Sequence, residues 1–497
     1  MSEQQSSYRS IFKATSLFGG VQVFNILISI IKSKVIAIYL GASGVGIMSL
    51  FQSALDTIAY LTNMGLSVSA VRSISEANDT GDETRIKRVV TTFRRWLWLT
   101  GVLGAVVTFC LSPFLSQWSF GNKDYTLSFM WLSVTLLLGA LSGGQITLLQ
   151  GMRKITYMAK SSIIGSTLGL FISLPLYYEM GVKGIVPTFI LSSILSLVLT
   201  IYFSRKLKIE KSDIELKASF HEGLGMVKLG VLITTSSFLS MLSAYLINIF
   251  ITHVGSLSDV GLYQGGTNIT NKYVGLVFTA MVVDYYPRLA GVSKDKVKVN
   301  EVVNQQTELT LLILAPILIL LLSTTPLVIR LFYTKEFLPI VIFVQWVVLG
   351  MMFKAVSWSI GFIVLAKGDS KLYFYKEIVT LLILLICNMA GYYFWGLEGL
   401  GISFLVGFVL VYLFVYQMVY ARYEFRFTKG YLYIFTTQFA LCIVAFLLAY
   451  FLKFPWAYFT GVILFGITGW ISFHEVDKRM DVKQIIRTKI MSKLGKK

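Results

Sequence analysis

Charged side chains are scarce in this sequence. Asp, Glu, Lys and Arg make up only 14% of the 497 residues, whereas 55% of the residues are hydrophobic. Soluble globular domains usually carry about 25% charged residues, so the composition excludes that class. The mean hydropathy is +0.72, and apolar runs of about 20 residues recur along the chain. The sequence therefore predicts an all-α polytopic membrane protein.

Cysteine and histidine are almost absent, with three residues of each. Cys110, Cys387 and Cys442 lie inside apolar runs without paired spacing, which indicates neither a disulfide framework nor a metal site. The sequence contains no GxxxxGK[ST], HExxH or GxSxG motif, and the predicted outer loops are short. We therefore expect a transporter without metal or cofactor and not an enzyme.

The distribution of the basic residues along the chain follows the predicted membrane topology. The net charge is +19, but the basic residues form short clusters between apolar runs, such as RIKRVVTTFRR at 85–95 and RKLKIEK at 205–211. Placing both termini in the cytoplasm puts most of these clusters on one side of the membrane, as the positive-inside rule requires. Nucleic acid is not an expected partner. The tail 475–497 predicts an amphipathic helix on anionic membrane lipids.

About fourteen apolar runs are long enough to cross a bilayer. Their centres lie near residues 26, 57, 105, 137, 166, 194, 236, 272, 316, 352, 383, 410, 441 and 464.

A weak internal repeat divides these spans into two groups. YLGASGVGIMSLFQSALDTI (39–58) and HVGSLSDVGLYQGGTNITNK (253–272) both place a glycine at the outer end of one span and Val-Gly at the start of the next. Repeats in the same orientation predict two six-helix lobes around a central cavity, with two extra C-terminal helices. The expected parts are a lobe at 1–204, a cytoplasmic connector at 205–219, a lobe at 220–425, spans 13 and 14 at 426–474, and the tail.

Polar residues follow single faces of several spans, and such faces must contact protein or water. The predicted cavity lining consists of Gln22, Asn25, Ser29, Gln52, Asn63, Gln264, Asn268, Asn271 and Ser357. The cationic substrate-binding candidates are Lys32, Lys34, Lys228, Lys272 and Lys354, and Asp56 is the candidate for coupling to an ion.

Structural roles for these charges stay open. A lysine in a span can snorkel to the interface or pair with a carbonyl or an acid. Asp56 can be a structural partner of Lys32 or Lys272, or a titrating group. Helical geometry places Lys32 on the polar face and turns Lys34 about 200° away from it. We therefore expect Lys32 to face the substrate and Lys34 to be a contact or interface cation.

Several segments resemble the Wzx-type flippases for O-antigen and enterobacterial common antigen units, in the multidrug/oligosaccharidyl-lipid/polysaccharide exporter superfamily. These segments are YLGASGVGIMSLFQ (39–52), GLYQGGTNITNKYVG (261–275), DYYPRLAG (284–291) and especially WVVLGMMFKAVSWSIGFIVLAKGDSKLYFYKE (346–377). The resemblance implies alternating access in the bacterial inner membrane and an undecaprenyl-diphosphate-linked oligosaccharide as substrate. By position, it assigns the basic residues of the family to Lys34, Lys228 and Lys354.

The resemblance also suggests a polysaccharide polymerase and a chain-length regulator as partners. Two other functions stay open at this point. A multidrug or cation antiporter of the same superfamily would need acids in its cavity, and a polysaccharide polymerase would need an exposed catalytic loop.

Overall fold

The structure, a computed structural model, describes residues 3–452 and 455–480, and within them the side chains except those at 3–19, 232–233, 272–273, 276–277, 279–284 and 480. Most of these described residues are helical and none lies in a β-strand, which confirms the predicted all-α class. The helices are α1 (Glu3–Asn63), α2 (Leu66–Thr80), α3 (Glu83–Phe120), α4 (Thr126–Gly151), α5 (Ile155–Met180), η1 (Gly181–Gly184), α6 (Ile185–Arg205), α7 (Leu216–Val254), α8 (Leu257–Gly291), α9 (Lys296–Phe332), η2 (Lys335–Phe337), α10 (Ile340–Ala366), α11 (Ser370–Tyr423), α12 (Lys429–Phe451) and α13 (Trp456–Met480).

Every predicted span centre falls inside one of these helices. Ten helical stretches of the described chain are long and apolar enough to cross a membrane, and three of them have 44, 51 and 54 residues. A single crossing needs about 20 residues, so each of these three holds two spans. A glycine with left-handed φ interrupts the longest helices: Gly41 in α1 (φ 63°) and Gly396 in α11 (φ 57°). Glycine adopts this conformation without a Cβ clash, so it marks the turn between spans.

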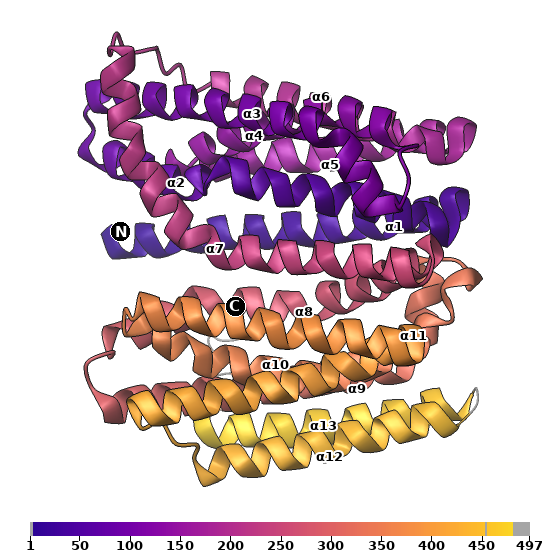
Figure 1. Ribbon diagram of the computed structural model, residues 1–497. Helices are drawn as coiled ribbons and strands as arrows, with labels where there is room; N and C mark the ends of the chain where they lie inside the picture. The colour runs from indigo at the N-terminus through magenta and orange to yellow at the C-terminus, as the bar shows by residue number, and fades with distance from the viewer. Residues whose placement is uncertain (1–2, 453–454, 481–497) are drawn as a thin grey trace, which may run out of the picture. The chain divides into compact units, whose positions relative to one another are not determined.

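The helices pack into two compact units. Unit 1 is Met1–Gly261 with Phe332–Thr334, and unit 2 is Leu262–Leu331 with Lys335–Lys497. In unit 1, α3 packs on α4, α4 and α5 pack on α6, and α1 packs on α5 (Figure 1). The helix α7 also packs against α1, α2 and α3 and so groups with unit 1. The expectation that α7 opens the second lobe rests on the sequence repeat alone.

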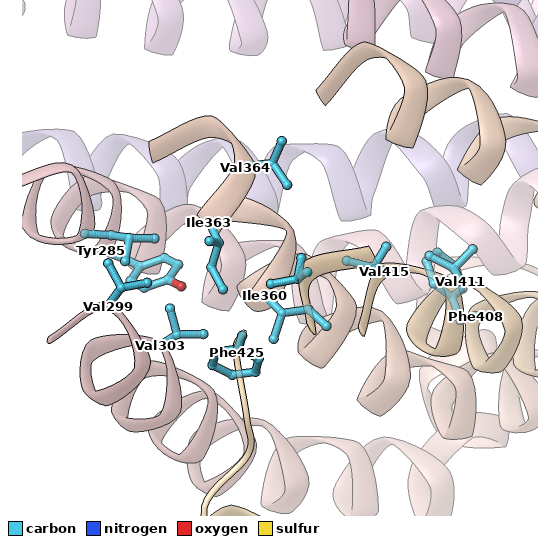
Figure 2. Packing of buried hydrophobic residues seen from close by; sticks show 12 residues of the cluster. Tyr285, Val299, Val303, Ile360, Ile363, Val364, Phe408, Val411, Val415 and Phe425 are labelled. Atoms are coloured by element: carbon cyan, nitrogen blue, oxygen red, sulfur yellow. The ribbon is translucent and has the colours of Figure 1, made fainter. Parts of the chain in front are cut away.

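Unit 2 has its own apolar core. Tyr285 of α8, Val303 of α9, Ile360 and Ile363 of α10 and Val415 of α11 are buried against one another (Figure 2). The phenol of Tyr285 is satisfied there, because it donates a 2.7 Å hydrogen bond to the Ser359 carbonyl.

The last two helices are attached to unit 2 through a polar network. Glu308 of α9 accepts 3.0 Å hydrogen bonds from Arg479 Nε of α13 and from Thr428 Oγ1, the N-cap of α12. Within α12 and α13, Gln438 Nε2 donates to Ser472 Oγ at 3.2 Å. Most of the predicted tail helix, residues 481–497, lies outside the described residues.

The Val-Gly steps of the sequence repeat meet each other in unit 1. A Cβ added to Gly46 would lie 1.9 Å from the Leu257 carbonyl oxygen, and one added to Gly261 would lie 1.8 Å from the Ala42 carbonyl oxygen. Each glycine thus lets the backbone of α1 approach the start of α8, as small residues do between helices in membranes.

We expect Gly261→Ala to lower the thermal unfolding midpoint of the detergent-purified protein. The added methyl group has no space, and overpacking a close contact costs about 1–3 kcal/mol. The matched control is Gly225→Ala, because a Cβ at that position in α7 meets no atom within 4 Å. Equal midpoints for the two variants would contradict the close approach at Gly261.

Candidate functional site

The first half of α1 presents a polar face to α5. Gln22, Asn25, Ser29 and Lys32 recur at steps of three and four residues, which places them on one side of the helix. Asn25 fixes this face, because its Nδ2 donates to Ser162 Oγ at 2.8 Å and its Oδ1 accepts from Ser166 Oγ at 3.0 Å. The four side chains line a cavity of about 530 Å³, here called the Asn25 cavity.

The second half of α1 lines another cavity of about 410 Å³, here called the Asp56 cavity. Gln52, Asp56 and Asn63 contribute to its wall together with residues of α3, α4 and α6. Gln52 Nε2 donates to Asp56 Oδ1 at 2.9 Å, one helical turn away. Asn63 Nδ2 donates a longer bond of 3.4 Å to Ser67 Oγ.

Lys32 belongs to the walls of both cavities, as does Ser192 of α6. Its side chain is half-buried, and among the described residues it makes no hydrogen bond or ion pair. Lys32 and Asp56 share the Asp56 cavity, yet they are not within the 4.0 Å of an ion pair. An ammonium group in this position can bind an anion from either cavity.

Lys34 has a different environment. Its Nζ donates a hydrogen bond to the main-chain carbonyl of Tyr333, which lies in the 332–334 segment of unit 1. Lys34 lines neither the Asn25 cavity nor the Asp56 cavity. Lys228 of α7 is exposed and also lies outside the walls of both.

In unit 2, Lys354 of α10 lies among aromatic rings. Its Nζ is 5.9, 5.9 and 5.6 Å from the ring centroids of Phe278, Phe404 and Phe408. Such distances allow cation–π attraction. Ser357 Oγ donates to the Lys354 carbonyl at 3.0 Å within the same helix.

The candidate polar residues of α8 lie in different surroundings. Gln264 Nε2 lies 3.4 Å from Asn268 Oδ1, and Asn271 is exposed. The side chain of Lys272 lies outside the described part of the structure. The central cavity predicted to bring all of these residues together stays a prediction, because the two cavities described above lie within unit 1.

Hydroxyl groups on α5 and α6 complete the Asn25 cavity, and the sequence analysis missed them. Ser192, Ser196 and Thr200 recur at steps of four on α6, and Ser162 and Ser166 do so on α5. This spacing is the same signal that identified the polar face of α1. It is weaker because serine and threonine also bond to the carbonyls of their own helix, as Thr200 does to Ser196 at 2.8 Å.

A bundle of apolar helices with polar cavities and an internal repeat is an architecture typical of membrane transporters. Solved structures share the fold. A lipid II flippase, MurJ, in an inward closed conformation matches with a TM-score of 0.70 at 14% identity, covering 94% of this chain and 99% of that one. An inward-facing MATE family multidrug resistance transporter of the MOP superfamily matches with a TM-score of 0.64 at 16% identity, covering 81% and 98%.

The chain belongs to the family described as "Polysaccharide biosynthesis protein", whose model matches residues 35–342. It is also similar to the lipid III flippase of Escherichia coli (strain K12), with 22% identity over 383 residues that cover 76% of this chain and 90% of the relative. The lipid III flippase of Shigella flexneri matches to the same extent. The fold is thus shared with flippases and transporters, and these likenesses support the predicted transporter class.

We expect a thiol at position 32 to be reachable from water. In a background in which Cys110, Cys387 and Cys442 are replaced by serine, Lys32→Cys should react with a hydrophilic thiol reagent at least roughly tenfold faster than Ala37→Cys, because thiol reactivity follows exposure. Ala37 lies on the same helix and is only 2% exposed. Equal rates in purified protein would show that Lys32 does not face an open cavity.

Proposed function

We propose that this protein is a flippase for a polyprenyl-diphosphate-linked oligosaccharide, which it moves across the bacterial inner membrane by alternating access. The pathway would be the assembly of O-antigen or another surface polysaccharide. The observation that carries the proposal is the ammonium of Lys32, unpaired among the described residues, between two cavities lined by amide and hydroxyl groups. Membership of a polysaccharide biosynthesis family and similarity to lipid III flippases support it.

The chemistry of the cavities suits such a substrate. A lipid diphosphate carries two or more negative charges, and its transfer into hydrocarbon without compensation would cost tens of kcal/mol. Lysine binds phosphate as a point charge, and Lys32 has no acid partner among the described residues. Asn25, Gln52 and the serines of α5 and α6 offer hydrogen bonds to sugar hydroxyls. The lipid tail can stay in the bilayer.

Asp56 is our candidate for the coupling group. It lines the same cavity as Lys32, and Gln52 holds one of its oxygens. An ionised Asp56 lowers the positive potential that an anion meets at Lys32, whereas a protonated Asp56 does not. A proton bound at Asp56 would therefore strengthen anion binding in the same cavity.

We expect Lys32→Ala to reduce translocation at least about tenfold, because a lost hydrogen bond to a charged group costs about 1.5–3 kcal/mol. Lys354→Ala should act in the same direction, and Lys32→Arg should retain activity. The measurement is complementation of a deletion strain, with surface glycan and cytoplasmic lipid-linked oligosaccharide quantified together. Lys123→Ala, at an exposed lysine outside both cavities, is the control.

A normal amount of surface glycan in the Lys32→Ala, Lys354→Ala double variant would contradict the proposal. Loss of drug resistance with unchanged glycan would instead identify a drug antiporter. Formation of new glycosidic bonds by the purified protein would identify a polymerase.

A further inference from the structure

A third cavity in unit 1, of about 560 Å³, lies between α3, α4 and the segment that joins α6 to α7. We call it the connector pocket. Its walls include Arg94 and Trp98 of α3, Leu141 and Gln145 of α4, and Lys211 and Asp213 of the connector. None of its residues belongs to the Asn25 cavity or the Asp56 cavity.

The connector wall of this pocket is held in place by α3. Arg95 Nη1 donates to the Ile214 carbonyl at 2.9 Å, and the Ser212 amide donates to Thr91 Oγ1 at 3.0 Å. Lys87 Nζ and Glu210 Oε2 form an exposed ion pair at 2.8 Å, and this contact lowers the pKa of the Glu210 carboxyl. The pocket is therefore built by the fold before anything binds in it.

Three polar side chains of the pocket have no polar partner in the described part of the protein. Arg94, Gln145 and Lys211 make no hydrogen bond or ion pair with any other described residue. Arg94 is half-buried, although its guanidinium carries five donors. The pocket also contains one acid, Asp213, so its cations outnumber its acids.

The depth of the pocket corresponds to the head-group region of a bilayer. At 1.5 Å per residue, Arg94 is roughly 16 Å from the span centre near residue 105, which is the edge of a hydrocarbon core about 30 Å thick. Trp98, one turn deeper, is 54% exposed. Tryptophan at this level is typical of a membrane interface. The charge pattern of the sequence predicts that this end of α3 is cytoplasmic.

We propose that the connector pocket binds the phosphate head group of an anionic phospholipid. Arg94 and Lys211 contact the phosphate, Gln145 donates a further hydrogen bond, and Trp98 and Leu141 contact the first part of an acyl chain. This site is separate from the proposed translocation cavities. Its test measures lipid binding and does not depend on what the protein transports.

The test is native mass spectrometry of the purified full chain with phosphatidylglycerol or phosphatidylethanolamine added. We expect retained phosphatidylglycerol to fall roughly tenfold in the Arg94→Gln, Lys211→Gln double variant, since each cation near a surface adds to the attraction of anionic lipid. The matched control is Arg85→Gln, Lys217→Gln, which removes the same two residue types at exposed positions outside the pocket. Lys211→Gln alone should give a partial loss, and this exposed residue carries little risk of misfolding.

Three results would overturn the proposal. The first is an equal loss of phosphatidylglycerol in the pocket variant and the control variant, both with unchanged thermal midpoints. The second is equal retention of phosphatidylethanolamine. The third is displacement of the bound lipid by inorganic phosphate or by a polyprenyl diphosphate, because the pocket would then take another phosphate source.

Discussion

A charge that lies in hydrocarbon without a partner is very unfavourable, and this constraint governs where the chain places its charged residues. Among the described residues, several ion pairs lie toward the ends of helices or in connectors, as with Lys87 and Glu210 or Lys296 and Glu424. Lys32 and Lys354 lie within spans and have no such acid partner in the described part of the chain. Their surroundings must stabilise them in another way.

The two units stabilise these lysines differently. Lys32 borders two cavities lined by amides and hydroxyls, where water or an anion can reach it. Lys354 lies near three phenyl rings, whose faces attract a cation. Neither arrangement cancels the positive charge, whereas a carboxylate partner would. Both lysines can therefore attract an anion, which is the property that a carrier of lipid diphosphates needs.

The sequence predicted the helices well, and each expected span centre lies in a helix. The reason is that a helix that crosses the hydrocarbon core needs about 20 mostly apolar residues, which hydropathy detects directly. It also predicted the polar face of α1, since helical spacing fixes which side chains share a side. It did not predict that Asn25 bonds to α5 or that α6 supplies a row of hydroxyls. Those features depend on which helices are neighbours, and spacing within one helix carries no such information.

Lys32 and Lys34 of α1 show that a residue's position in a sequence comparison and its surroundings in the structure can point to different roles. Resemblance by position selects Lys34, whereas helical geometry selects Lys32, two residues earlier. In the structure Lys34 donates its hydrogen bond to the Tyr333 carbonyl, and a backbone carbonyl satisfies an ammonium without any ligand. Lys32 has no comparable partner among the described residues and borders both cavities. A side chain that the protein already satisfies gains less from binding an anion, so Lys32 stays our proposed substrate-facing charge.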